Sequence, residues 1–199
     1  MFHRLSVLLA VVGAATSVAA QPPAFDRSGA TVVLRYQEII GALAADDPGP
    51  SVEVFGDGRV VVRYPAYMKA AGVYTTQIAL AEVEAMVAEV VDAGIADFNH
   101  DAVARELRQA QAARAAAAQP RASQGTIVTY VSDPSTTVIE AHLQPEPGKR
   151  SSKKVAAARW TGLAGDAEKY PEVETLKDLA GAEQRLRALM QREDLRKTE

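Results

Sequence analysis

Two β-prone runs flank a glycine-rich turn at residues 51–64, and this segment constrains the fold more than any other. Its sequence is SVEVFGDGRVVVRY. Valine-rich runs of this length are typical of strands, and an Asp-Gly pair suits a two-residue type I′ hairpin turn. A turn centred on Asp57-Gly58 predicts that Phe55 lies opposite Val60. Both faces of the hairpin then carry apolar side chains, so we expect it to lie in a sheet covered on both sides.

Further strands and an amphipathic helix surround this hairpin. Residues 31–36 and 73–78 have the composition of strands. Residues 80–92 place leucine, valine and methionine at helical spacing, and Gly94 marks the end of that helix. Because the apolar face of such a helix has to be buried against another element, we expect a helix packed on a sheet.

A second β-rich unit occupies residues 126–143. The runs TIVTYV and TTVIEAHL are separated by a turn that contains Asp-Pro-Ser. We predict that they form a second hairpin, in which Tyr130 faces Ile139. A third strand is expected at about residues 153–160.

Two more helices are predicted, and they differ in character. Residues 101–118 are rich in alanine, the best helix former, but offer few large apolar groups. We therefore expect an exposed helical insertion at 101–122. The closing helix, at about 171–192, has an apolar stripe that consists of Val173, Leu176, Leu179, Leu186, Leu189 and Met190.

These elements predict an α+β fold: a mainly antiparallel sheet with packed amphipathic helices and a helical Ala-rich insertion. A lead-in at 21–30 precedes a single domain at 31–199. The two halves of this domain share an order of strands and helices that is compatible with an internal duplication, although the sequence shows no repeat.

Residues 1–20 have the three parts of a secretory signal peptide: a basic start with Arg4, an apolar run and an exit of small residues. We expect cleavage near Ala20 and a periplasmic or secreted product. The apolar run is shorter than the roughly 20 residues that a spanning helix needs, so no membrane span is expected after cleavage. The chain contains no cysteine, which excludes a disulfide framework and a lipid anchor on a cysteine.

The order of these motifs resembles a group of uncharacterised secreted bacterial proteins. The resemblance rests on FGDGRVVV, DAGI, YVSDPSTTVIEAHL and DAEKYPEVETL, and covers most of residues 31–190. It implies export and an α+β fold, and it implies no activity, cofactor or site residue.

A possible metal site lies at residues 97–101. Asp97, Asn99 and Asp101 have the alternating spacing that begins a calcium-binding loop. The loop pattern then fails, because Ala102 stands where glycine is needed and Arg108 where a bidentate glutamate is needed. We predict no metal site; instead, Asn99 or Asp101 caps the following helix.

Catalytic candidates are few. His100 and His142 are the only histidines after residue 20, and the sequence has no G-x-S-x-G elbow, HExxH motif or phosphate-binding glycine loop. Glu140 and His142 are two residues apart on one predicted strand and so share a face, where a carboxylate can orient an imidazole for general base chemistry. A periplasmic hydrolase that uses this pair or the Asp97–Asp101 cluster is therefore the alternative hypothesis. No catalytic residue or cofactor is predicted.

The leading hypothesis is a non-catalytic binding or interaction domain of the cell envelope, whose partner is another envelope or extracellular component. Removal of residues 1–20 leaves 21 basic and 25 acidic residues, a net charge of −4, which argues against nucleic acid as the partner. Tyrosines are favoured at interfaces. A binding surface is predicted to consist of Tyr36, Tyr64, Tyr67 and Tyr74.

Overall fold

The computed structural model describes residues 23–41, 49–117, 134–144 and 155–198 of the 199-residue chain. The strands are β1 (Val32–Ile39), β2 (Ser51–Phe55), β3 (Arg59–Tyr64), β4 (Gly72–Gln77), β5 (Thr136–His142), β6 (Val155–Thr161) and β7 (Arg196–Lys197). The helices are α1 (Leu80–Asp92), α2 (His100–Ala117), α3 (Leu163–Lys169) and α4 (Glu174–Ala188), with short 3-10 turns η1 (Ile95–Asp97) and η2 (Leu189–Gln191). The expected α+β fold is confirmed.

All seven strands form one antiparallel sheet in the order β6-β5-β1-β2-β3-β4-β7. The central strand β1 pairs with β2 on one side and with β5 on the other. Two parts of the chain that are far apart in sequence therefore share one sheet and one hydrophobic core.

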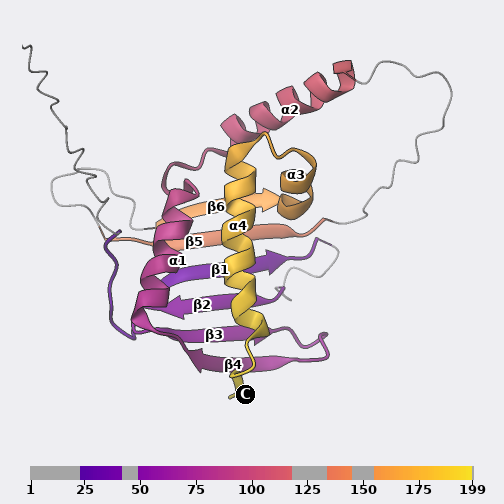
Figure 1. Ribbon diagram of the computed structural model, residues 1–199. Coiled ribbons are helices and arrows are strands. Elements are labelled where there is room, and N and C mark those ends of the chain that lie inside the picture. Colours follow the sequence, from indigo (N-terminus) through magenta and orange to yellow (C-terminus); the bar gives the residue numbers. More distant parts are fainter. Residues whose placement is uncertain (1–22, 42–48, 118–133, 145–154, 199) are drawn as a thin grey trace, which may run out of the picture.

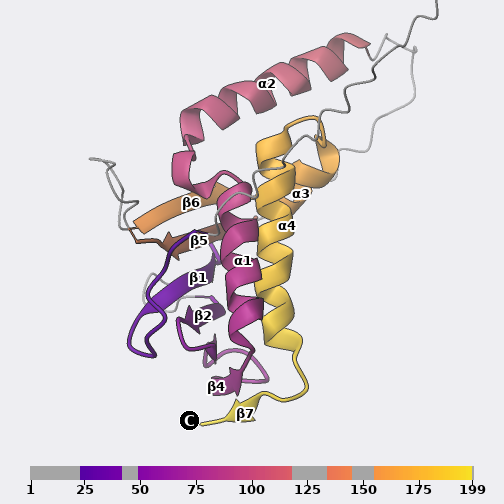
Figure 2. The same cartoon turned by 60° about the vertical axis from the view of Figure 1, so that its left-hand side comes forward.

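Helices α1 and α4 lie side by side across one face of this sheet (Figure 1). The rotated view shows both on the same side, and no helix covers the opposite face of the described sheet (Figure 2). Each helix buries an apolar stripe: Val83, Met86, Val87 and Val90 in α1, and Leu176, Leu179, Ala182 and Leu186 in α4. Burial of these two stripes, about 1.5–3 kcal/mol for each large side chain, is what holds the layers together.

The first hairpin forms, but its register differs from the prediction by one residue. Val54 pairs with Val60, and the turn has three residues, 56–58, in which Gly58 adopts a left-handed conformation (φ 89°). This register sends the valines of both strands at even positions to the helix-covered face. The opposite face receives charged side chains such as Glu53 and Arg63, which explains why that face needs no cover, contrary to the expectation.

The turn conformation makes Gly58 hard to replace. In Gly58→Ala the new Cβ would collide with the carbonyl oxygen of Ile78 while the backbone keeps its positive φ. We expect a loss of about 1–3 kcal/mol in the free energy of unfolding, measured by urea denaturation. Gly165→Ala is the control, because its Cβ would meet no atom within 4 Å in α3; it should stabilise by about 0.4–1 kcal/mol. Equal effects of the two substitutions would contradict the assigned turn.

The second predicted hairpin does not form as expected. Ile139 of β5 lies between Tyr36 of β1 and Ala158 of β6, so both edges of β5 are occupied. The predicted partner segment, residues 126–131, lies outside the described residues. A long-range pairing with β1 takes the place of the local one, because it places the alternate residues Thr137, Ile139 and Ala141 under the helices.

The Ala-rich helix is confirmed as an exposed arm. Helix α2 leaves the end of the sheet (Figures 1 and 2) and buries only Val103 and Leu107. Helix α3 was not predicted from the sequence; it forms directly after β6. No described helix is long and apolar enough to cross a membrane.

Candidate functional site

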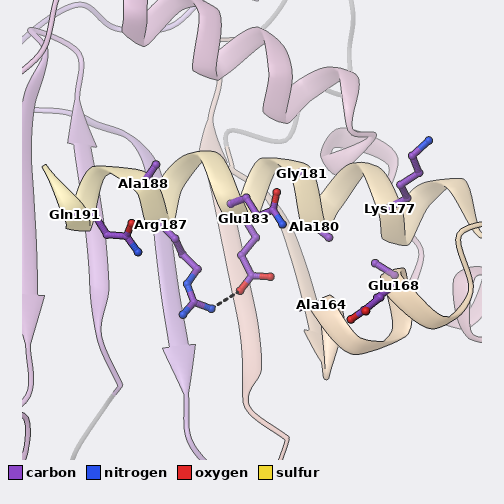
Figure 3. A pocket seen from close by; sticks show the side chains of 11 residues that line it. Ala164, Glu168, Lys177, Ala180, Gly181, Glu183, Arg187, Ala188 and Gln191 are labelled. Carbon is purple, nitrogen blue, oxygen red and sulfur yellow. Dashed lines mark hydrogen bonds and ion pairs between the residues drawn. The ribbon is translucent and has the colours of Figure 1, made fainter.

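The larger of the two described grooves, about 700 Å³, lies along α4 and is bounded at one end by α3. Figure 3 shows it from close by. Its lining combines small side chains with charged and amide groups: Ala164, Ala167, Glu168, Lys177, Ala180, Gly181, Glu183, Gln184, Arg187, Ala188 and Gln191. Small residues on the helix surface leave the space open, and a few polar groups give it chemical character.

Glu183 is the most unusual residue of this groove, because it is a charged residue that is only 4% exposed. Its Oε1 atom accepts hydrogen bonds from the hydroxyls of Tyr36 (3.4 Å) and Thr137 (3.1 Å). The same oxygen lies 3.4 Å from Nη1 of Arg187, one helical turn further along α4. No described residue donates a hydrogen bond to the second oxygen, Oε2, which is not fully enclosed.

The Tyr36 hydroxyl has to be protonated in order to donate its hydrogen bond to Glu183. Burial first, and then the nearby Glu183 carboxylate, raise the pKa of the Tyr36 hydroxyl far above its usual range. The hydroxyl therefore remains protonated at neutral pH and acts as a donor. A buried carboxylate that receives several hydrogen bonds is held in place, and these bonds offset part of the cost of its burial.

The guanidinium of Arg187 interacts electrostatically with a second carboxylate, that of Glu38, as well as with Glu183. Burial acts to lower the pKa of its guanidinium, but the neighbouring Tyr36, Glu38 and Glu183 groups together raise it above its ordinary value. Glu168 from α3 adds a further carboxylate, while Lys177 points away from Glu183 and the groove (Figure 3). The groove lining thus holds two carboxylates and two cations, of which only Arg187 is paired with Glu183.

The opposite face of the sheet carries a row of alternating charges. Arg35 bridges two neighbouring strands, with Nη2 2.9 Å from Glu53 and Nη1 3.4 Å from Glu140. Arg63 lies 3.9 Å from the other oxygen of Glu53. A smaller hollow of about 240 Å³ lies beside this row. Because the arginines are about half-exposed and each carboxylate is paired with an arginine, the row resembles an ordinary sheet face with cross-strand ion pairs.

The four tyrosines predicted as a binding surface do not lie on one surface. Tyr36 is fully buried. Tyr64 and Tyr74 are partly buried and pack edge to face at 5.6 Å between ring centres, and the Tyr64 hydroxyl donates to the carbonyl oxygen of Met190. Only Tyr67, at 44%, is well exposed. Alternation along the strands explains the difference, since Tyr36, Tyr64 and Tyr74 occupy positions that face the helices.

Glu140 and His142 share one face of β5, as predicted, whereas His100 and Asp97 lie on other elements. His142 Nε2 lies 3.8 Å from Oε2 of Glu140, but that same oxygen is paired with Arg35. His100 lies near the far end of β6, where its ring centre is 5.0 Å from that of Trp160 on the helix-covered face. Neither histidine lines either of the two grooves.

The segment at residues 97–101 begins a helix. Asn99 Oδ1 accepts a hydrogen bond from the backbone N–H of Ala102 at 3.0 Å, so the predicted cap of α2 is Asn99. Asp97 and Asp101 are exposed. Among the described residues, no group of three or more histidine, aspartate or glutamate side chains is placed to hold a metal ion.

Sequence reasoning missed Glu183, although a signal for it was present. The residue lies four positions after Leu179 and three before Leu186, within the apolar stripe of the closing helix. An acidic residue at a stripe position is expected to be buried and paired. Its partners Tyr36 and Thr137 could not be named, because they are 147 and 46 residues away in the sequence.

The protein was compared with protein-family models, curated proteins and solved structures. No family model matches the sequence, and neither the curated proteins nor the solved structures give a match.

Proposed function

We propose that this protein is an exported, non-catalytic binding domain of the cell envelope, and that the groove along α4 is its binding site. The observation that carries the proposal is the Glu183 carboxylate. It is almost completely buried, one oxygen receives every described hydrogen bond, and the other is left for a group in the groove. A buried carboxylate is costly unless all its bonding capacity is used, so a ligand group is a natural partner for the second oxygen.

Export is the part of the proposal that rests on the sequence alone, through the signal peptide features of residues 1–20. It makes a periplasmic or extracellular component the expected partner. The hydrolase alternative has less support, because neither histidine nor Asp97 lines the groove along α4 or the smaller hollow on the opposite face.

The experiment compares what the wild-type protein and two variants capture from the envelope. The protein is purified as its own cells process it, immobilised and exposed to solubilised envelope material, and the bound components are quantified by mass spectrometry. Gly181→Trp fills the groove, because Gly181 is exposed, lines it and has free space at its Cβ position. Asp178→Trp is the matched control on the same helix, outside the lining.

We expect at least one component to be bound by the wild type and by Asp178→Trp and lost from Gly181→Trp. Circular dichroism checks that both variants are folded. Capture that is the same in all three proteins, or that is absent from the wild type, would overturn the assignment of the groove as the binding site.

A further inference from the structure

We infer that the group held in the groove is an aliphatic primary ammonium; this inference rests on the proposed function and names the class of its ligand. Its first support is the hydrogen bonding of Glu183. Tyr36, Thr137 and Arg187 all direct their donors to Oε1, which fixes the carboxylate and leaves Oε2 open. The missing partner of a carboxylate oxygen is a hydrogen-bond donor, and a charged donor forms the stronger bond.

The charges around this oxygen favour a cation. Glu183, Glu38 and Glu168 supply three carboxylates from α4, β1 and α3. Arg187 is the one cation close to Glu183 among the described residues, and it is already paired there. Lys177 extends outward (Figure 3). An anionic ligand beside Oε2 would be repelled by the carboxylates of Glu183 and Glu168, which line the groove.

The single free oxygen favours an ammonium group over a guanidinium. A guanidinium binds a carboxylate best through two parallel hydrogen bonds, one to each oxygen. Because Oε1 already receives three donors, it has no room for a fourth in good geometry. An ammonium acts as a compact point charge and needs only one oxygen of Glu183.

The rest of the lining favours an aliphatic stem on that ammonium. Five of the lining residues carry no side chain beyond a methyl group: Ala164, Ala167, Ala180, Gly181 and Ala188. They form a shallow apolar wall along α3 and α4 next to the acidic cluster. Methylene groups packed on this wall gain about 0.8 kcal/mol each when fully buried, while the charged end reaches Glu183.

The test is an NMR titration of the full protein, purified as its cells process it, with n-butylammonium as the probe. Backbone amide shifts of Ala180, Gly181 and Glu183 report binding. Butyrate and 1-butanol have the same chain length with an anionic or a neutral end, and N-butylguanidinium carries the other cation. N-acetyl-lysine amide tests whether the source is a lysine side chain: tighter binding than n-butylammonium indicates a polypeptide, and equal or weaker binding indicates a free amine.

We expect saturable shifts with n-butylammonium and binding that is at least about tenfold weaker for N-butylguanidinium, butyrate and 1-butanol. Glu183→Gln should weaken n-butylammonium binding by about tenfold or more, because the amide keeps an acceptor for Tyr36 and Thr137 but loses the charge. Glu174→Gln, the same change on α4 outside the groove, should change it less than about twofold.

The inference is overturned if N-butylguanidinium, butyrate or 1-butanol binds as tightly as n-butylammonium, if Glu183→Gln binds like the wild type, or if n-butylammonium causes no shifts. Should Glu183→Gln fail to fold, Glu168→Gln replaces it, with an expected weakening of about two- to threefold for an exposed charge. Unchanged binding in Glu168→Gln would then overturn the inference. A negative titration together with loss of capture in Gly181→Trp would leave the groove as the binding site and reject only the ammonium.

Discussion

Leu186→Ala is expected to lower the free energy of unfolding by about 2–5 kcal/mol. Leu186 is completely buried in the stripe of α4 that packs against α1 and the sheet. Removal of three carbon atoms there leaves a cavity that the surrounding strands cannot close, so both transfer free energy and packing are lost. Urea denaturation followed by circular dichroism measures the change.

The control for this substitution is Leu80→Ala at the start of α1. Leu80 is 37% exposed, and its truncation should cost less than about 1 kcal/mol. Equal losses in the two variants would contradict the assignment of the α4 stripe to the hydrophobic core. The position of α4 beside the groove would then be in error as well.

Glu183→Leu should cost about 2–4 kcal/mol of unfolding free energy. Leucine fits the volume but accepts no hydrogen bond, so the buried hydroxyls of Tyr36 and Thr137 lose their acceptor. Each unsatisfied buried polar group costs about 1–3 kcal/mol. Arg187 is half-exposed and can turn to water, so it adds little. Glu174→Leu, at an exposed position in the first turn of α4, should stay within about 0.5 kcal/mol of the wild type.

A double-mutant cycle separates the hydrogen bond from the change in packing. Tyr36→Phe is expected to destabilise the wild type by about 1 kcal/mol or more, because it removes one donor to Glu183. In the Glu183→Leu background the same change should be neutral or stabilising, since it removes a hydroxyl that has no partner. An identical cost in both backgrounds would show that Tyr36 and Glu183 are not coupled.

Local elements were predictable because their signals are local. The spacing of residues 80–92 gave α1 almost to the residue, and the alanine content of residues 101–118 gave an exposed helix. The register of the first hairpin was wrong because Gly56 and Gly58 flank Asp57, and the sequence is compatible with a two-residue or a three-residue turn. The pairing of Val54 with Val60 identifies the three-residue turn, since a positive φ at Gly58 suits either turn.

The pairing of β1 with β5 and the groove along α4 could not be predicted from local sequence patterns, because both depend on contacts between residues far apart in the sequence. The partner of β5 was assigned to the neighbouring segment, whereas burial of its alternate residues is better satisfied beside β1. Tyr36 was predicted to lie on a surface because tyrosines are favoured at interfaces. Its position between Leu34 and Glu38 on the helix-covered side of β1 buries it instead. Its hydroxyl meets Glu183 only after both layers are assembled.

The central claim is that ligands bind in the groove along α4 and not on the charged face of the sheet. Intermolecular nuclear Overhauser effects between n-butylammonium and the protein test it most directly. The account predicts contacts from the butyl methylene protons to the methyl groups of Ala180 and Ala188, which line the groove. Contacts to Val138 or Val155, on the opposite face of β5 and β6, without any to the two alanines would contradict it.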